Sequence, residues 1–552
     1  MSHLQEVAYQ LTSSPLVLAQ CLLLLLVPLL LLLHYYASRR SGSNRRHGSS
    51  CSDDKQQLPP SPPGLPIIGH LHLIGDLPHV SLRDLSAKHG RDGLMLLHLG
   101  AATTLIVSSP QAAETIMRTH DHVFASRLVS TVSDDLMYGS SDIAFSPYGE
   151  HWRQARKLVT THLLTVKKVH SYRSARKEEV HLVLAYVQEA AAAGTAVDMG
   201  MMMNMFANDI VSRAVTGKFF RAEGRSKLFR ELVEANSALV GGFNLEYYFP
   251  GLARSLGFLS RRFLRNRAHE THKRWDELLE TILSDHERRD SMMHRHDGGD
   301  FIDVLLSVQK EYGMTRDHVK AILVDMFGAG TDTSSLVLEL AMAELMRNPQ
   351  QMAELQGEVR KHTPEGQETV EEENLPNMPY LRAVVKETLR LHPPAPLLVP
   401  RLSMADCVVD GGYYVPSGTR VIVNAWALGR DPESWEKPEE FMPERFMDGG
   451  SAAAIDFRGN HFQFLPFGAG RRICAGINFG MATVEIMLAN LMYCFDWQLP
   501  IGMEKQGVDM TEVFGVTVHL KEKLMLVPVP KLRATSGHSM QAAEETSMTK
   551  LK

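Results

Sequence analysis

The residues best suited to chemistry in this 552-residue chain lie in one short loop late in the sequence. The loop carries a single cysteine, Cys474, within the run Gly468-Ala469-Gly470-Arg471-Arg472-Ile473-Cys474-Ala475-Gly476. Small residues let backbone approach a flat ligand, and backbone N–H groups can moderate the charge on a thiolate. Such a cysteine suits the axial position of a haem iron, where thiolate electron density favours O–O cleavage.

Other interpretations of this loop remain open at this point. A free cysteine is most often a small buried apolar residue. A structural zinc site needs about four Cys or His ligands, and no second cysteine lies near Cys474. The runs 468–470 and 328–330 both read Gly-Ala-Gly, but neither completes the G-x-G-x-x-G pattern of dinucleotide-binding loops, so that interpretation is weak.

An acid and an alcohol, Asp332 and Thr333, stand next to each other inside a long helical pattern. Gly330 weakens the helix, and the neighbouring hydroxyl groups can divert backbone hydrogen bonds, so we expect a local kink or groove. An adjacent carboxyl and hydroxyl can relay protons to a reacting oxygen. The alternative is a helix with a tolerated glycine and an N-cap-like Asp-Thr pair.

Two pairs of residues have the spacing of neighbours on one face of a helix. Glu387 and Arg390 are three residues apart, which on a surface helix would stabilise by only about a few tenths of a kcal/mol. Trp152 and Arg156 are four residues apart and could simply stack on a surface. Spacing alone assigns neither pair to a site.

Together these motifs resemble those of the cytochromes P-450, the haem-thiolate monooxygenases. The loop matches F-x-x-G-x-R-x-C-x-G at Phe467, Gly470, Arg472, Cys474 and Gly476. The resemblance covers essentially the whole chain after its N-terminal segment, with four signatures in the family's order. It implies that the cofactor is haem b, with the iron ligated by the thiolate of Cys474.

The resemblance also implies roles for the other motifs. Asp332 and Thr333 match the catalytic acid–alcohol pair, which family members that only rearrange peroxides often lack, so true oxygenation is expected. Glu387, Arg390 and Arg445 match a buried ion network that acts as a structural clamp. The remaining matches are expected to contact haem: Trp152, Arg156, Arg401, Phe467, Gly470, Arg472 and Gly476.

The N-terminal region reads as a membrane anchor. Leu16–Leu33 is almost wholly apolar and, at about 18 residues, is near the lower limit for crossing a bilayer. Arginines follow this run and none precedes it, which places the following chain in the cytosol. We expect a lumenal segment 1–15, a signal anchor 16–36 in the endoplasmic reticulum membrane, a basic linker and Pro-rich hinge 37–69, a catalytic domain 70–533 and a disordered tail 534–552. A cleaved signal peptide is the competing interpretation.

Composition limits the remaining possibilities. A hydrophobic content of 44% is ample for a core, and a net charge of −5 points to no nucleic-acid partner. Five irregularly spaced cysteines are not a disulfide framework. Residue patterns predict both strands and helices. The resemblance implies the cytochrome P-450 fold, which is mainly α with small β-sheets, and these patterns are consistent with it. The strands are expected at Gly93–Leu99, Thr104–Ser108, Cys407–Val415, Thr419–Val423 and Thr517–Val527, and the long helices at Lys177–Ala192, Ser260–His286 and Met314–Met346.

By analogy, a largely hydrophobic pocket is expected from Ser126–Ser141, Ala395–Val399 and Phe514–Thr517. The chain shows no flavin or nicotinamide fingerprint, so electrons should come from a separate NADPH–cytochrome reductase docking near the cysteine side. The finer resemblance is to plant enzymes of specialised metabolism, especially grass hydroxylases of indole-derived compounds. We therefore expect O2 and an apolar, indole-like or other aromatic substrate. The alternatives are a haem protein that senses a ligand without turnover, and a reductase-independent isomerase or dehydratase.

Overall fold

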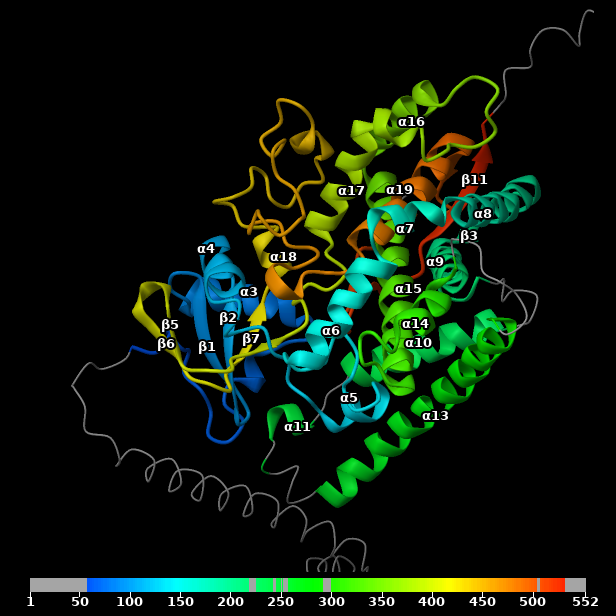
Figure 1. Cartoon of the computed structure of the whole chain (residues 1–552). Coiled ribbons are helices and arrows are strands. Elements are labelled where there is room, and N and C mark those ends of the chain that lie inside the picture. The colour runs from blue at the N-terminus through cyan, green and yellow to red at the C-terminus, as the bar shows by residue number, and fades with distance from the viewer. Residues whose placement is uncertain are drawn as a thin grey trace, which may run out of the picture.

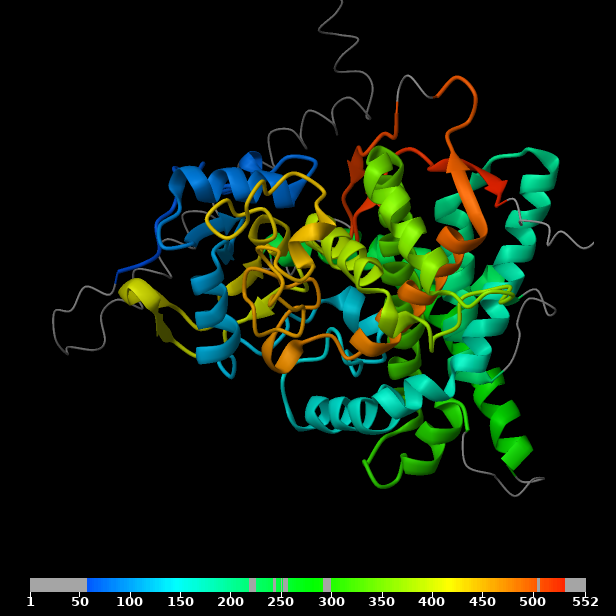
Figure 2. The same ribbon diagram turned by 90° about the horizontal axis from the view of Figure 1, so that it is seen from above.

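The structure is a computed structural model that describes residues 57–217, 225–241, 245–249, 251, 257–290, 299–503 and 507–531. A helical part and a smaller part rich in strands lie side by side (Figure 1). The view from above shows the same division, with helix α3 and the blue and yellow strands on one side and the long helices, with the red C-terminal strands, on the other (Figure 2). The predicted lumenal segment, anchor and tail lie outside the described residues.

Helices make up most of the described chain, which confirms the mainly α prediction. The three long helices predicted from periodicity correspond to α8, α13 and α15. The α-helices are α3 (Pro78–His89), α4 (Pro110–Glu114), α5 (Thr131–Leu136), α6 (Glu150–Leu158), α7 (Val166–Ser171), α8 (Arg173–Ala193), α9 (Met199–Thr216), α10 (Arg225–Gly241), α11 (Leu245–Tyr248), α13 (Gly257–Asp290), α14 (Phe301–Val308), α15 (Arg316–Arg347), α16 (Pro349–His362), α17 (Pro379–Leu391), α18 (Ala425–Leu428) and α19 (Ile477–Cys494). The short 3₁₀ or π turns are η1 (Leu71–Leu73), η2 (Thr115–Thr119), η3 (Val159–Leu163), η4 (Leu375–Asn377), η5 (Asp410–Gly412), η6 (Pro443–Phe446) and η7 (Gly470–Arg472).

The strands form small sheets. One has the order β1-β2-β7-β4, another β3-β11-β8, and two are pairs, β5-β6 and β9-β10. In the largest sheet, β1 and β2 are antiparallel and β2 and β7 are parallel. The strands are β1 (Leu94–Leu99), β2 (Ala102–Val107), β3 (Val197–Asp198), β4 (Arg401–Leu402), β5 (Cys407–Val409), β6 (Tyr413–Val415), β7 (Arg420–Val423), β8 (Phe495–Gln498), β9 (Glu512–Val513), β10 (His519–Leu520) and β11 (Met525–Pro530).

Two of the predicted strand runs are divided. The run 407–415 is a hairpin, because Gly411 and Gly412 adopt positive φ angles of 78° and 75° that reverse the chain between β5 and β6. The run 517–527 contains β10 and the start of β11, which belong to different sheets. The alternation of apolar residues marks extended chain but does not show where it turns.

Helix α15 is the central element of the helical core, and it packs against α9 and α19. Its start is fixed by a capping box between Thr315 and His318, and its length is about 48 Å at 1.5 Å per residue. The helix is not interrupted near Gly330, where the sequence predicted a kink or groove. A Cβ atom at Gly330 would lie 2.8 Å from Val211 Cγ2, so this glycine permits the close approach of α9.

Within the described residues, α15 and α19 are long and apolar enough to span a membrane. The most apolar stretches of these helices are 72% and 61% buried inside the protein, respectively. Their apolar character is therefore explained by their position in the core.

Candidate active site

The loop before helix α19 presents the sulfur of Cys474 at an accessible position. The backbone N–H of Gly476 points to this sulfur at 3.3 Å, and the N–H of Cys474 donates to the carbonyl of Phe467 at 2.9 Å. Desolvation by the surrounding protein raises the pKa of the Cys474 thiol, while the Gly476 N–H and the charge of Arg156 act in the opposite direction. The thiol thus has the two kinds of neighbour that stabilise a thiolate.

Gly470 fits the loop against the neighbouring chain. Its φ is 66°, and a Cβ atom there would lie 2.3 Å from the carbonyl oxygen of Met117. Asp121 holds the same loop, because it accepts the N–H of Arg471 at 2.8 Å and a guanidinium hydrogen of Arg401 at 2.9 Å. The glycine in this position is required by both backbone conformation and space.

Buried arginines gather behind the loop. Arg472 donates from all three guanidinium nitrogens to backbone carbonyls, and its guanidinium lies 4.1 Å from the ring centre of Trp152. Burial and, after it, the charge of Arg401 lower the pKa of Arg472 to about 9. Arg127 is buried beside them, and burial together with these two neighbours lowers its pKa as well. Three guanidinium groups therefore repel one another here.

Few carboxylates balance this positive charge. Asp121 contacts Arg401, but Asp142, the other nearby acid, has its pKa raised to about 6 by burial. Burial and then the charge of Asp142 raise the pKa of Asp325 of α15. A hydrogen bond with Asp325 lowers the pKa of Asp142, but burial outweighs it. Because burial disfavours ionisation of both acids, they offset little of the arginine charge, and the cluster attracts a further anionic group.

Helix α6 contributes Trp152 and Arg156, which the sequence placed one turn apart. The indole N–H of Trp152 donates to the carbonyl of Ile143 at 3.0 Å. Arg156 donates to the carbonyl of Ile473 at 2.5 Å, beside the cysteine. Trp152 stacks on Arg472. Trp152 and Arg156 therefore each contact the region of the Cys474 loop, and they do not stack on each other at the surface.

Glu387, Arg390 and Arg445 are brought together in a buried cluster. Arg390 donates to both carboxylate oxygens of Glu387 at 2.7 and 2.8 Å, and Arg445 donates to the same carboxylate at 3.1 Å. The exposed fractions of the three side chains are 0%, 0% and 2%. A buried network of this kind resists rearrangement, because losing one member leaves an uncompensated charge.

On α15, the acid and the alcohol point to different partners. The Thr333 hydroxyl donates to the carbonyl of Ala329 at 2.7 Å, on an accessible part of this otherwise buried helix. The carboxylate of Asp332 accepts a hydrogen bond from the hydroxyl of Thr517. His519 lies 3.5 Å from the same carboxylate oxygen. The N-cap-like interpretation does not apply, because both residues lie in the helix interior.

The three segments expected to line a pocket serve partly for packing. Ser130 and Ser133 form the capping box of α5 inside the first segment. Phe514 stacks on the ring of His79 with centres 6.0 Å apart. Thr517 is buried against Asp332.

Arg127 and Thr517 lie within segments that the sequence predicted as pocket lining, but their individual roles were not predicted, and His519 was not predicted at all. Arg127 is the one charge in the run 123–129, and that isolation is the signal that could have singled it out. Thr517 and His519 carry no such signal, because their partner Asp332 is 185 residues from Thr517 in the chain.

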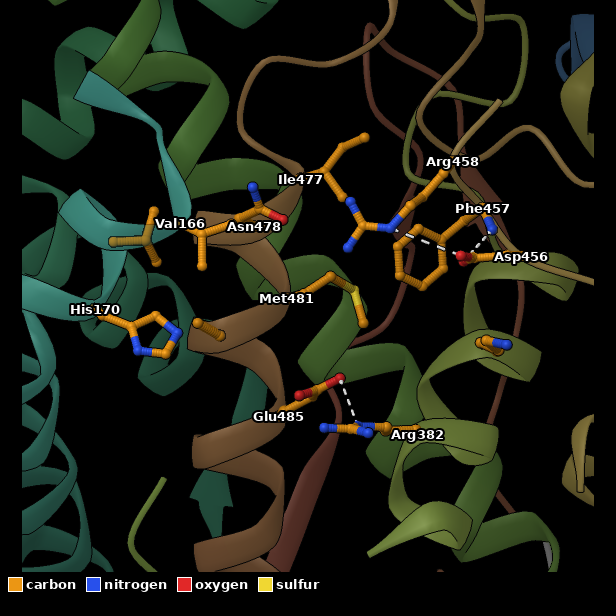
Figure 3. Close-up of a pocket in the computed structure, with 13 residues that line it drawn as sticks. Val166, His170, Arg382, Asp456, Phe457, Arg458, Ile477, Asn478, Met481 and Glu485 are labelled. Carbon is orange, nitrogen blue, oxygen red and sulfur yellow. Dashed lines mark hydrogen bonds and ion pairs between the residues drawn. The ribbon is translucent and has the colours of Figure 1, made fainter. Parts of the chain in front are cut away.

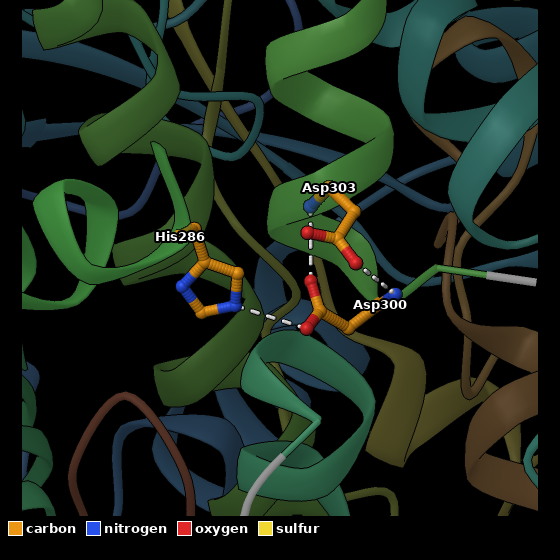
Figure 4. A group of neighbouring side chains, drawn as sticks. All are labelled: His286, Asp300 and Asp303. Carbon is orange, nitrogen blue, oxygen red and sulfur yellow. Dashed lines mark hydrogen bonds and ion pairs between the residues drawn. The ribbon is translucent and has the colours of Figure 1, made fainter. Parts of the chain in front are cut away.

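A second group of ligand-type side chains, His286, Asp300 and Asp303, is explained by packing (Figure 4). The two imidazole nitrogens of His286 contact the Ile282 carbonyl at 2.7 Å and Asp300 at 2.9 Å. Asp300 and Asp303 form the capping box of α14. These side chains therefore stabilise a helix start.

The donor set behind the loop fits haem. The accessible sulfur of Cys474 would ligate the haem iron, and the buried guanidinium groups would pair with the two carboxylates that haem carries. Glycines at 470 and 476 let the loop lie close to its surroundings.

The chain belongs to the family described as Cytochrome P450, which it matches over residues 59–527. It is 57% identical over 471 residues to the indole-2-monooxygenase of Zea mays, covering 85% of this chain and 87% of that protein. It is 55% identical over 485 residues to the 3-hydroxyindolin-2-one monooxygenase of Zea mays, covering 87% and 90% of the two chains. A zebra fish cytochrome P450 solved with abiraterone superimposes with a TM-score of 0.69 at 26% identity, covering 83% of this chain and all of that one.

The family and these relatives identify the activity class. The chain is a P450 monooxygenase, and its cofactor is haem bound through a cysteine thiolate. It acts with O2 on an apolar substrate.

Proposed function

We propose that this monooxygenase inserts one oxygen atom from O2 into an indole-like, apolar plant metabolite, while the second oxygen atom leaves as water. The observation that carries the proposal is the identity of 57% and 55% with maize enzymes named for indole and 3-hydroxyindolin-2-one. A third maize relative, 53% identical over 479 residues, is named indolin-2-one monooxygenase. Such identities across most of each chain favour a related aromatic nitrogen heterocycle as substrate.

In this proposal each part of the site has its own task. Cys474 ligates the haem iron, and haem supplies the oxygen activation when bound. Arg127, Arg156, Arg401 and Arg472 attract the haem carboxylates. Arg156 and Arg401 also donate to carbonyl groups of the loop that carries Cys474. The remaining haem contacts are assigned to Trp152, Phe467, Gly470 and Gly476.

Asp332 and Thr333 manage protons in this scheme. The Asp332 carboxyl group takes up and releases a proton, and the Thr333 hydroxyl holds a proton at the accessible face of α15. Glu387, Arg390 and Arg445 take no part in bond making. They clamp α17 to the turn η6 and keep the haem side of the protein rigid.

The substrate assignment is tested by expressing the full chain in microsomes with a reductase. Indole, indolin-2-one, a flavanone and a diterpene are supplied with isotopically labelled dioxygen, and products are identified by mass spectrometry. We expect one labelled oxygen atom in a product of indole or indolin-2-one. Labelled product from only the flavanone or the diterpene would contradict the indole-like assignment.

The electron donor is proposed to be a membrane-bound, NADPH-fed reductase that docks on the face beside the Cys474 loop. A cavity of about 440 Å³ opens there, and helix α19, which begins three residues after Cys474, forms part of its wall (Figure 3). Basic residues outnumber acidic ones around this cavity, which suits an acidic protein partner. The lining residues are Val166, Val169, His170, Arg382, Lys386, Asp456, Phe457, Arg458, Ile477, Asn478, Met481, Ala482 and Glu485.

Reversal of one lining charge tests the docking face. Arg382 is about half exposed and lies 3.9 Å from Glu485. The R382E variant is expected to need more reductase for half-maximal turnover at low salt, with the difference shrinking as salt screens the interaction. The control is K88E on α3, in the strand-rich part. An equal reductase requirement for both variants would contradict docking on this face.

The N-terminal segment 16–36 is proposed as a single-pass anchor in the endoplasmic reticulum membrane, with the catalytic domain 70–533 in the cytosol. The apolar run at 16–33 and the arginines that follow it support this topology. Protease treatment of sealed microsomes should digest the catalytic domain and leave only a short lumenal fragment. Protection of the whole catalytic domain would contradict this orientation.

A further inference from the structure

The carboxylate of Asp332 is linked to the protein surface through two residues of the β9–β10 region. The Thr517 hydroxyl donates to Asp332 Oδ2. The Nε2 atom of His519 lies 3.0 Å from Thr517 Oγ1. Hydrogen-bonded atoms therefore run without a gap from the imidazole through Thr517 to the carboxylate. His519 Nε2 also lies 3.5 Å from Asp332 Oδ2, so the hydroxyl route is the shorter-spaced of two contacts between these groups.

His519 is the most exposed of the three residues. Its side chain is 46% exposed, whereas the side chain of Asp332 is 12% exposed and Thr517 is buried. Solvent therefore reaches the imidazole far more readily than it reaches the hydroxyl or the carboxylate.

The hydrogen-bonding chemistry of these three side chains sets the direction of proton transfer. When protonated, His519 donates from Nε2 to Thr517 Oγ1, and the Thr517 hydroxyl in turn donates to the carboxylate. Each donor thus points toward Asp332, as proton transfer into the protein requires. A hydroxyl can pass one proton on while accepting another, so Thr517 ends the step unchanged.

Acidic side chains surround the imidazole. Burial opposes protonation, but the hydrogen bond and charge of Asp332, followed by the charges of Glu339 and Glu234, raise the pKa of His519 above its ordinary 6.5. Glu339 lies two turns after Asp332 on α15, and burial raises its pKa to about 7. These acids favour the protonated form of the His519 imidazole.

We propose that His519 and Thr517 form a proton relay that supplies Asp332 from solvent during turnover. Protonated His519 passes its Nε2 proton to Thr517 Oγ1 while the hydroxyl proton of Thr517 moves to Asp332 Oδ2, which leaves neutral His519 with its proton on Nδ1. Solvent hydronium then returns a proton to the imidazole and restores the starting state. Each cycle moves one solvent proton to Asp332, as needed when one oxygen atom of O2 leaves as water. The inference rests on the proposed role of Asp332.

The T517V variant tests the relay with little change in volume. With a substrate identified as above, we expect the amount of product formed per NADPH consumed to fall roughly tenfold. A positioned proton donor contributes more than this, but water can partly replace the missing hydroxyl, so the expected loss is smaller. The T517S variant, which keeps the hydroxyl, should restore most of the yield. The control is T511V, which removes an exposed hydroxyl that bonds only Asp509 nearby.

The pH profile separates a relay from a merely structural contact. Because protonated His519 is the donor, the product yield of the wild type should fall as pH rises through the pKa of His519. In the H519Q variant this alkaline limb should disappear. Glu339 and Glu234 remain in that variant, so a limb that persists unchanged would assign the titration to them and overturn the proposal.

A measurement without turnover tests the His519–Asp332 link itself. The rate of diethylpyrocarbonate modification at His519, followed by mass spectrometry across pH in the holoenzyme, reports the pKa of this imidazole. The D332N variant should lower that pKa. An unchanged pKa would overturn the relay, even if no substrate were known. A loss of product in D332N with a wild-type yield in T517V would overturn the relay while leaving the proposed function of Asp332 intact.

Discussion

Replacing Glu512 with glutamine removes a buried carboxylate that lies between two imidazoles. Glu512 of β9 contacts His79 Nε2 at 3.1 Å and lies 3.8 Å from His392 Nδ1. The second nitrogen of His392 contacts Glu344 of α15 at 2.7 Å. These contacts connect the β9–β10 hairpin, which carries Thr517, to α3 and α15.

The pKa shift of Glu512 gives the size and the sign of its contribution to the free energy of unfolding. Burial alone would raise the pKa of Glu512, but the hydrogen bonds and charges of His392 and His79 outweigh it and lower the pKa from 4.5 to about 2. This lowering corresponds to roughly 3 kcal/mol of stability, present above pH 4.5 and lost as pH falls toward 2.

Deprotonation of His392 reduces the stabilising effect of Glu512 at alkaline pH. Burial opposes protonation of His392, but Glu344 and Glu512 raise its pKa above 6.5. The stability gained from charged His392 is therefore complete below pH 6.5 and lost as pH rises through the raised value. The E512Q variant should lose most stability between about pH 4.5 and 6.5, and less at high pH.

Urea unfolding midpoints measured near pH 5.5 and pH 9 check this prediction. The control is E439Q, because the side chain of Glu439 is 61% exposed and its pairing with Arg430 at 3.0 Å is partly solvated. The control should change the midpoint little at either pH. An equal loss for E512Q at both pH values, or a loss no larger than that of the control, would refute the reasoning.

Three other substitutions have defined outcomes. R445A should lower the free energy of unfolding by about 3–5 kcal/mol and reduce the haem content per polypeptide, whereas R288A on the surface should change neither. Normal haem content in R445A would contradict the clamp role of Arg445. G470A should prevent the Cys474 loop from closing, since both φ and space forbid it, while G366A, with open space at its Cβ, should retain haem; a haem-loaded G470A would contradict this. R127L should speed haem transfer to apomyoglobin, and an unchanged rate would remove Arg127 from the haem site.

The parts of the site that could be predicted from sequence are those encoded locally. The Cys474 loop carries its ligand, glycines and arginine within ten residues, and Glu387 and Arg390 share one helical turn. Their chemistry is visible without knowing the fold. Arg445 was found because its own short motif has a family counterpart.

The parts that could not be predicted depend on segments distant in the chain. The contact of Thr517 with Asp332 joins residues 185 positions apart, and no local pattern indicates it. The contact of Gly330 with α9 could not be predicted for a similar reason, because its neighbour Val211 lies on another helix. Local propensity predicts a weak point in a helix, whereas packing decides what the glycine is for.

The central claim, a haem iron bonded to the sulfur of Cys474, is tested most directly by the reduced carbon-monoxide difference spectrum. The wild type and C474S are compared at equal polypeptide concentration. The wild type should show the red-shifted Soret band of a thiolate-ligated haem, and C474S should show none. A thiolate-type band that persists in C474S, or a wild type whose spectrum shows nitrogen ligation, would contradict the assignment.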